Sequence, residues 1–160
     1  MITQDELIKL FEYRDGNLYW KECIGKRVKI GALAGWTDTE YKKVRIKNKP
    51  YAIHRIIFMM KHGYVPEQVD HIDGNKFNNC IENLRPANNS TNQQNVGIQK
   101  NNKSGIKGVC WHKASNKWVV QLGINGKPKH FGCYFDKEVA KFVAETMRHK
   151  YHREFANHGN

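Results

Sequence analysis

The sequence lacks the features that define several protein classes. Its four cysteines are scattered, and no two of them form a C-x-x-C pair. A zinc knuckle needs closely spaced ligands, so the sequence argues against structural zinc. The cysteines are instead expected to be reduced and mostly buried. No stretch is long and apolar enough to cross a membrane, and residues 1–6 have neither the basic region nor the apolar run of a signal peptide. We therefore expect a cytoplasmic protein with no membrane association.

Acidic residues are missing from a long part of the chain. No Asp or Glu occurs between Glu82 and Asp136, whereas eight Lys or Arg do. Over all 160 residues, 27 Lys and Arg stand against 15 Asp and Glu, which gives a net charge of +12 and a pI near 9.6. This balance favours a polyanionic partner, either nucleic acid or an anionic membrane surface, over a merely solubilising surface. The length allows one medium domain or two small ones.

The first part of the chain carries mixed helix and strand patterns. Thr3 followed by Glu6 is a capping-box signature, and the apolar spacing after it predicts a helix to about Tyr13. Short strands are expected at 18–20, 28–36 and 41–47, and a buried helix at 52–62. Further strand, loop and helix patterns follow at 69–72, 73–79 and 88–96, and the polar, glycine-flanked run at 97–104 is typical of a linker.

After that linker the pattern predicts a small second domain at 105–157. Three strands are expected at 108–111, 117–122 and 130–135. Asn125-Gly126 between the last two is a strong hairpin signal. Asp136 is placed to cap a closing helix. The predicted fold class is therefore α+β, with a sheet-plus-helix domain whose core is small.

The candidate catalytic residues lie between Asp70 and Asn92. Asp70-His71 is followed by Asn83, twelve positions after His71, and then by Asn92. Phosphodiester hydrolysis needs a base that activates water and a hard cation that holds the phosphate, and these side chains offer both. The alternative is that Asp70-His71 is only a capping pair at a strand end. The neighbouring Asp73, Asn75, Asn78 and Asn79 are expected to form turns rather than to bind an ion.

Residues 52–96 resemble the HNH endonucleases, specifically the phage and intron homing type with Asn at the third motif position. The resemblance is carried by His54-Arg55, Asp70-His71-Ile72-Asp73-Gly74-Asn75, Asn78-Asn79, Asn83-Leu84-Arg85 and Asn92. It implies a ββα-metal core at 51–96, to which residues 1–50 add a helix and strands. It also implies that His71 is the general base and that Asn83 braces the loop holding it. Asp70 and Asn92 would then ligate one Mg²⁺ or Mn²⁺ per active site.

Residues 103–156 resemble an AP2-type DNA-binding domain. The matching positions are Ser104-Gly105, Gly108-Val109, Trp111, Lys117-Trp118, Gly132, Tyr134-Phe135 and Glu154-Phe155-Ala156. The resemblance implies a sheet that lies in the major groove. The candidate DNA contacts are Lys107, Trp111, Lys113, Lys117, Trp118, Gln121, Lys127 and Lys129, together with His54 and Arg55 from the nuclease part.

Two of these assignments have alternatives. The two tryptophans could be core aromatics, and His54 could have a structural role. Because the sheet region has Lys throughout and no Arg before Arg148, binding should rest on phosphates with modest sequence preference.

The sequence thus predicts a Mg²⁺-dependent endonuclease that cuts double-stranded DNA and belongs to a phage or mobile element. A non-catalytic DNA-binding regulator is the first alternative, and a structured-RNA binder or RNA nuclease is the second. One HNH unit holds one metal site, so a monomer would nick one strand and a homodimer could cut both. The sequence leaves both assemblies open.

Overall fold

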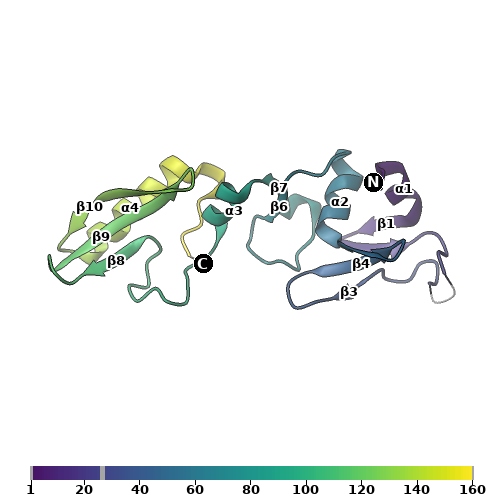
Figure 1. The fold of residues 1–160 in the computed structure, drawn as a ribbon, viewed down its shortest axis with the longest axis horizontal. Helices are drawn as coiled ribbons and strands as arrows, with labels where there is room; N and C mark the ends of the chain where they lie inside the picture. The colour runs from purple at the N-terminus through teal and green to yellow at the C-terminus, as the bar shows by residue number, and fades with distance from the viewer. Residues whose placement is uncertain (1, 26–27, 160) are drawn as a thin grey trace. The chain divides into compact units, whose positions relative to one another are not determined.

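The computed structural model describes residues 2–25 and 28–159 of an α+β chain (Figure 1). The chain divides into two compact units, Met1–Asn88 and Asn89–Asn160. The division falls before the segment 89–95, which was expected to close the nuclease core, because this segment packs against the end of the second unit. No helix in the described ranges is long and apolar enough to cross a bilayer.

The first unit combines two helices with short antiparallel strands. Its elements are α1 (Gln4–Leu10), β1 (Phe11–Arg14), β2 (Asn17–Trp20), β3 (Trp36–Thr37), β4 (Lys42–Ile46), β5 (Lys49–Ala52), α2 (Ile53–His62), β6 (Gln68–His71), the 3-10 turn η1 (Ile81–Asn83) and β7 (Leu84–Ala87). The strands pair as β1-β2, β3-β4-β5 and β6-β7. The last of these hairpins carries the candidate catalytic residues.

The N-terminal helix begins as the sequence predicts and ends earlier. Thr3 Oγ1 accepts the N–H of Glu6 at 3.3 Å, and the Glu6 carboxylate accepts the N–H of Thr3 at 3.0 Å, which is the expected capping box. The helix ends at Leu10 and not near Tyr13, because Phe11 enters β1 and packs against Trp20 with ring centroids 4.6 Å apart. Cross-strand packing of these two buried rings replaces the last helical turn.

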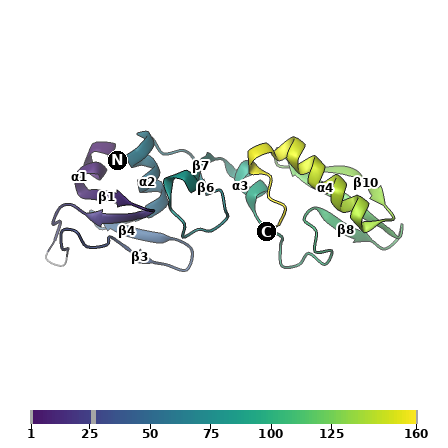
Figure 2. The ribbon, with the colours of Figure 1, turned by 180° about the vertical axis from the view of Figure 1, so that it is seen from behind.

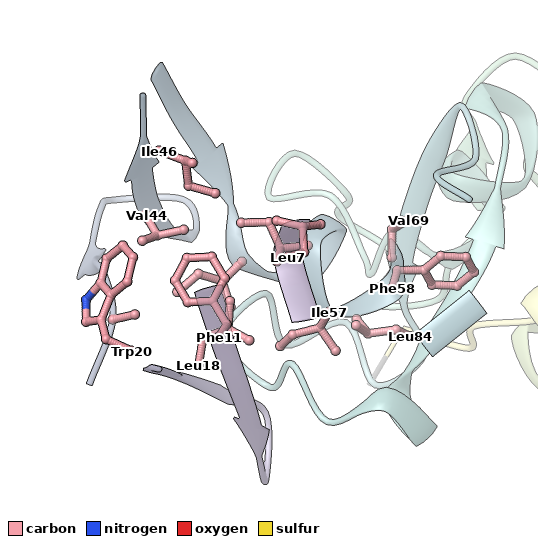
Figure 3. Close-up of a cluster of buried hydrophobic side chains, with 13 residues drawn as sticks. Leu7, Phe11, Leu18, Trp20, Val44, Ile46, Ile57, Phe58, Val69 and Leu84 are labelled. Carbon is pink, nitrogen blue, oxygen red and sulfur yellow. The ribbon is translucent and has the colours of Figure 1, made fainter. Parts of the chain in front are cut away.

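A single hydrophobic cluster joins the elements of the first unit (Figure 3). Ile57 and Phe58 on α2 are almost fully buried in this cluster. Val69 on β6 and Leu84 on β7 belong to the same cluster. The β6–β7 hairpin is therefore fixed to the core through α2.

Two expectations for this region and for the cysteines are wrong. No strand covers 28–36; among the described residues Leu33 makes an isolated bridge to Tyr19, and β3 starts only at Trp36. Gly31 and Gly35 have positive φ, and Gly35 lies so close to the Lys43 carbonyl that no side chain fits there, so the chain turns where a strand was expected. The thiols are not mostly buried: Cys23, Cys110 and Cys133 are exposed.

The second unit is a three-stranded sheet with one long helix. Its elements are α3 (Asn89–Asn95), β8 (Val109–His112), β9 (Lys117–Ile124), β10 (Lys127–Tyr134), α4 (Lys137–His152) and the 3-10 turn η2 (Arg153–Phe155). The strand order is β10-β9-β8, and α4 covers one face of this sheet (Figure 2).

The predicted signals at the ends of these elements are confirmed. Asn125 and Gly126 adopt the positive φ values of the hairpin turn, and Asp136 Oδ1 caps α4 by accepting the N–H groups of Glu138 and Val139.

Candidate active site

The β6–β7 hairpin brings Asp70 and His71 to one end of the first unit. Asp70 pairs with Arg85 across the two strands, and His71 pairs with Leu84. Asp70 is 6 % exposed and His71 is 4 % exposed, so both polar side chains lie inside the fold. Burying such polar side chains costs folding free energy unless each one is hydrogen-bonded or ion-paired. The partners of Asp70 and His71 therefore define the site.

Arg85 holds the carboxylate of Asp70. Its Nε lies 2.9 Å and its Nη2 2.8 Å from Oδ2 of Asp70, and both side chains are about nine-tenths buried. A guanidinium has a rigid fork of donors and stays charged, so it fixes the carboxylate in one orientation. The carboxylate is thereby fixed at the position that directly precedes His71 in β6.

Asn79 holds the imidazole of His71. The Nε2 atom of His71 lies 2.9 Å from Oδ1 of Asn79, whose side chain is buried at 1 % exposure. An amide oxygen only accepts, so Nε2 carries the proton and Nδ1 is the basic nitrogen. From the sequence Asn79 is predicted only to form a turn, because the spacing of asparagines in a loop does not indicate which side chain points into the fold.

The loop between β6 and η1 is tied together by Asp73 and Asn83. Asn83 Oδ1 accepts the backbone N–H of Asp73 at 3.0 Å, and its Nδ2 donates to Asp73 Oδ1 at 2.9 Å and to the Asn78 carbonyl at 2.8 Å. Burial raises the pKa of Asp73, but hydrogen bonds from Asn78, Asn83 and the amide of Asn75 outweigh it and lower the pKa. Asn83 thus hydrogen-bonds to the backbone of the loop that follows His71.

The β1–β2 hairpin supports the same loop from the other side. Gly16 has φ of +74°, and a Cβ atom there would lie 2.8 Å from the backbone nitrogen of Cys80 and 3.0 Å from the carbonyl carbon of Asn79. Nearby, Tyr13 Oη accepts the N–H of Ile81 at 3.0 Å. These contacts join residues far apart in the sequence, and no local pattern indicates them.

His54 lies beside His71 and has an unusual environment. Its ring centroid is 5.1 Å from that of His71 and 4.9 Å from that of Tyr41. Burial, followed by the charges of His71 and Arg55, lowers the pKa of His54 to about 3. Its Nδ1 is buried without a hydrogen-bond partner. His54 is therefore neutral at physiological pH, and its position favours the structural alternative over a contact with phosphate.

Arg55 ties α2 to the segment before β6. Its Nη1 donates to the Glu67 carbonyl at 3.1 Å and its Nη2 to the Pro66 carbonyl at 3.2 Å. These two hydrogen bonds fix the position of the segment that leads into β6. That Arg55 contacts DNA stays a prediction.

The predicted metal ligands are divided between the two units. Asp70 is in the first unit, and Asn92 lies on α3 in the second. The described residues contain no cluster of three or more His, Cys, Asp or Glu that could hold an ion. Asp70 offers carboxylate oxygens, and Mg²⁺ typically keeps several waters and takes one or two carboxylates plus substrate phosphate. Asn92 as second ligand stays a prediction.

The faces of the second sheet separate the candidate DNA contacts. Val120 and Leu122 on β9 are buried against α4, so by alternation Lys117 and Gln121 lie on the opposite face, here called the open face. Trp111 pairs with Trp118 across β8 and β9 on the α4 side, with ring centroids 4.9 Å apart. Trp118 packs against the core, which favours its alternative as a core aromatic.

The remaining lysines have different surroundings. Lys129 Nζ lies over the rings of Tyr151 and Phe131, at 4.7 and 5.6 Å from their centroids. Lys107 donates to the carbonyls of Gln94 and Val96, and burial lowers its pKa to about 8. Lys113 and Lys127 are exposed. Lys107 therefore holds the end of α3, and its contact with DNA stays a prediction.

Comparisons with known proteins agree with this geometry. A family model described as HNH endonuclease matches residues 51–94. Protein 3.8 of Escherichia phage T7 is 33% identical over 105 residues, which make up 64% of this chain and 86% of that protein. The chain belongs to the HNH endonuclease family. No solved structure matches it.

The HNH family is a family of phosphodiester hydrolases, so this chain is an enzyme, and the family implies nuclease activity on DNA. The expected resemblance to HNH endonucleases is confirmed. The matched segment contains α2, β6, the loop and β7 and ends within α3. It therefore includes the hairpin on which Asp70 and His71 lie.

Proposed function

We propose that this HNH protein is a Mg²⁺- or Mn²⁺-dependent endonuclease that hydrolyses phosphodiester bonds of double-stranded DNA. The observation that carries the proposal is that His71, held by Asn79, directly follows the Arg85-bound Asp70 in β6. A base held in one tautomer and a fixed carboxylate on the same short strand are the two groups that metal-assisted hydrolysis needs.

His71 is the general base in this proposal. Asn79 accepts the Nε2 proton, so in this proposal Nδ1 is the ring nitrogen that takes a proton from water. Asn83 and Gly16 act as positioning residues, because they hold the loop that includes Asn79. A base that is displaced by even 1 Å loses much of its effect on the rate.

Asp70 and Asn92 are the residues we assign to the divalent ion, through their carboxylate and amide oxygens. When bound, such an ion supplies positive charge to the scissile phosphate and the leaving oxygen. The Arg85 guanidinium keeps the Asp70 carboxylate in place. One ion per active site is expected.

The second unit is the proposed DNA-binding part, with an AP2-like mode of contact through the open face. Lys117 and Gln121 on that face are its central contacts. A phage homing role is the biological setting that the resemblance to homing endonucleases favours. It predicts a defined target site, which cleavage mapping on genomic DNA of the host and of related phages tests.

Relaxation of supercoiled plasmid tests the proposal. Nicked or linear product should form with Mg²⁺ or Mn²⁺, disappear with EDTA and disappear in His71→Ala. His62→Ala is the matched control, because His62 is an exposed histidine at the end of α2 and should leave cleavage unchanged. The ratio of nicked to linear product separates action as a monomer from action as a dimer.

Two results would contradict the proposal. If His71→Ala cleaves DNA at the wild-type rate, the assignment of His71 as the general base is wrong. DNA binding without any cleavage, with either ion and on several DNAs, would favour the non-catalytic regulator. Competition between duplex DNA and structured RNA decides whether RNA is the preferred polymer.

A further inference from the structure

The second unit contains a pocket that has no role in the proposed cleavage mechanism. Its volume is about 830 Å³, and most of its lining comes from residues within 93–102 and 121–128, together with Gly108 and His152. Pockets that take small organic ligands have volumes of roughly 300–1,000 Å³. The pocket lies at the end of the sheet where β9 turns into β10, and we call it the Gly123 pocket.

The chemistry of the lining is polar and free of negative charge. Among the described lining residues none is Asp or Glu, whereas Gln93, Gln94, Gln99, Asn101, Gln121 and Asn125 all contribute carboxamides. A carboxamide offers both donors and an acceptor, and Asn and Gln are the side chains that pair with the edges of bases. Lys127 adds a positive charge at the same site.

Gly123 keeps the floor of the pocket open. It lies in the middle of β9, where its neighbour Leu122 faces the core, so Gly123 faces the other way. Its φ is not in the left-handed region, and a Cβ atom there would meet nothing within 4 Å. The backbone does not require glycine at this position, and a strand glycine of this kind marks a place where a ligand approaches the backbone closely.

His152 supplies a second sign of a ligand. Its Nε2 lies 2.9 Å from the Gly123 carbonyl and therefore donates to it, which makes Nδ1 an acceptor. Nδ1 is buried without a hydrogen-bond partner, and the side chain, 5 % exposed, lines the pocket. A buried acceptor without a donor is costly, and the N–H of a base would satisfy it.

We propose that the Gly123 pocket binds one unpaired nucleotide of the substrate strand, with the base edge against the carboxamides and His152 and the phosphate near Lys127. This inference rests on the proposed function, because that function makes a nucleic-acid strand the partner. No aromatic ring of Phe, Tyr or Trp lines the pocket among its described residues, so recognition is by hydrogen bonds and not by stacking. Base preference is then expected among oligonucleotides of equal length.

The test measures binding of the full chain in EDTA, so that it does not depend on cleavage. Four probes are compared: inorganic phosphate, single deoxynucleoside monophosphates, four-nucleotide single strands of each base, and a closed hairpin duplex. The readouts are the side-chain amide resonances of Asn and Gln and the anisotropy of a labelled strand. Single strands should shift the pocket amides more than phosphate does, and one base should bind best.

Gly123→Val is the decisive variant, because the space above Gly123 is empty and valine suits a strand. It should fold as well as the wild type and weaken single-strand binding at least tenfold. Gly25→Val is the matched control, since Gly25 also has an ordinary φ, has nothing within 4 Å, and does not line the pocket. Gln121→Ala should weaken binding roughly threefold to tenfold through loss of one hydrogen bond.

Three results overturn the inference. The first is that Gly123→Val binds single strands with wild-type affinity. The second is that phosphate alone causes the same amide shifts as single strands do. Exclusive binding of the closed duplex is the third. If Gly123→Val does not fold, Gln99→Ala decides instead, because Gln99 lines the pocket, is exposed and is not a proposed contact of the open face. A chain that binds single strands in this way but never cuts DNA refutes the nuclease proposal and leaves the pocket assignment intact.

Discussion

Asn79 Oδ1 lies 2.9 Å from Nε2 of His71, and both side chains are buried. The contact assigns the proton of the imidazole to Nε2, and Nδ1 is the base in the proposed mechanism. It resembles the second-layer hydrogen bonds that fix the tautomer of functional histidines in other sites. The following predictions concern this contact, the glycine behind it, the neighbouring histidine and the open face of the second unit.

Asn79→Ala should lower kcat by about 10- to 100-fold with a small change in KM, because the base remains but its ring is no longer held. Asn79→Asp keeps the accepting oxygen and should cleave faster than Asn79→Ala. Its added negative charge favours the protonated ring, so the acid limb of its pH–rate profile should move to higher pH. Steady-state cleavage of a labelled duplex over a pH series checks both variants. Equal kcat in Asn79→Ala and wild type would show that the contact does not matter for the rate.

Gly16→Ala should impair both folding and cleavage. The new Cβ atom would clash with the backbone at Asn79 and Cys80, in addition to the strain of positive φ. Gly74→Ala is the matched control, because Gly74 has nearly the same φ, +73°, lies in the β6–η1 loop that Gly16 contacts, and has nothing within 4 Å of a Cβ. Urea denaturation should show a loss for Gly16→Ala that exceeds the loss for Gly74→Ala by about 1 kcal/mol or more.

The cleavage rates of the two glycine variants distinguish backbone strain at positive φ, which both variants have, from displacement of the loop that carries Asn79, which only Gly16→Ala causes. Only Gly16→Ala moves the backbone that carries Asn79, so only this variant should lose activity under conditions where both are folded. If the two variants lose stability and activity equally, the close approach of the β1–β2 turn has no separate effect.

The sequence predicted most of the elements and only part of the site. The capping box at Thr3, the helix at 52–62, the hairpin at Asn125-Gly126 and the cap at Asp136 are local signals, and local hydrogen bonds decide them. The segment 28–36 was misjudged, because two glycines with positive φ turn the chain between apolar residues that fit a strand.

The missed parts of the site depend on contacts between distant residues. Asn79 differs from Asn78 only in the direction of its side chain, and that direction depends on where β6 places His71. Gly16 and Tyr13 meet the loop across more than 60 positions of sequence. A single sequence contains no periodic pattern for such pairs, and they emerge only from packing against the shared core.

His54 should make the stability of the protein depend on pH. Its pKa is lowered from 6.5 to about 3 by burial, so the native state keeps it neutral while the unfolded state takes up a proton below about pH 6.5. The stabilisation is therefore fully present above that pH and is lost as the pH falls toward about 3. Between about pH 7.5 and about pH 5 this group alone should remove about 2 kcal/mol from the free energy of unfolding.

His54→Phe isolates that contribution, because the ring stays and the ionisable nitrogen goes. Urea denaturation at the two pH values should show a smaller pH-dependent loss in His54→Phe than in wild type, by about 2 kcal/mol. An identical pH dependence in both proteins would mean that His54 takes up its proton equally well in the folded state.

Lys117 and Lys129 should differ in their effect on DNA binding. Each ammonium lies over an aromatic ring, Lys117 over Phe135 at 4.5 Å and Lys129 over Tyr151 at 4.7 Å from the centroid. Lys117, however, lies on the open face of the sheet, whereas Lys129 pairs with the core-facing Leu122. If about six phosphates are contacted, log Kd against log salt should have a slope near 5 in magnitude, and each contact accounts for about 0.9 of it. Lys117→Ala should lower that magnitude by about 0.9, and Lys129→Ala should leave it nearly unchanged. Anisotropy titrations of a labelled duplex over a salt series, in EDTA, measure both slopes. Equal slopes for the two variants would contradict the assignment of the open face as the DNA-binding surface, since the two lysines differ chiefly in the face from which they project.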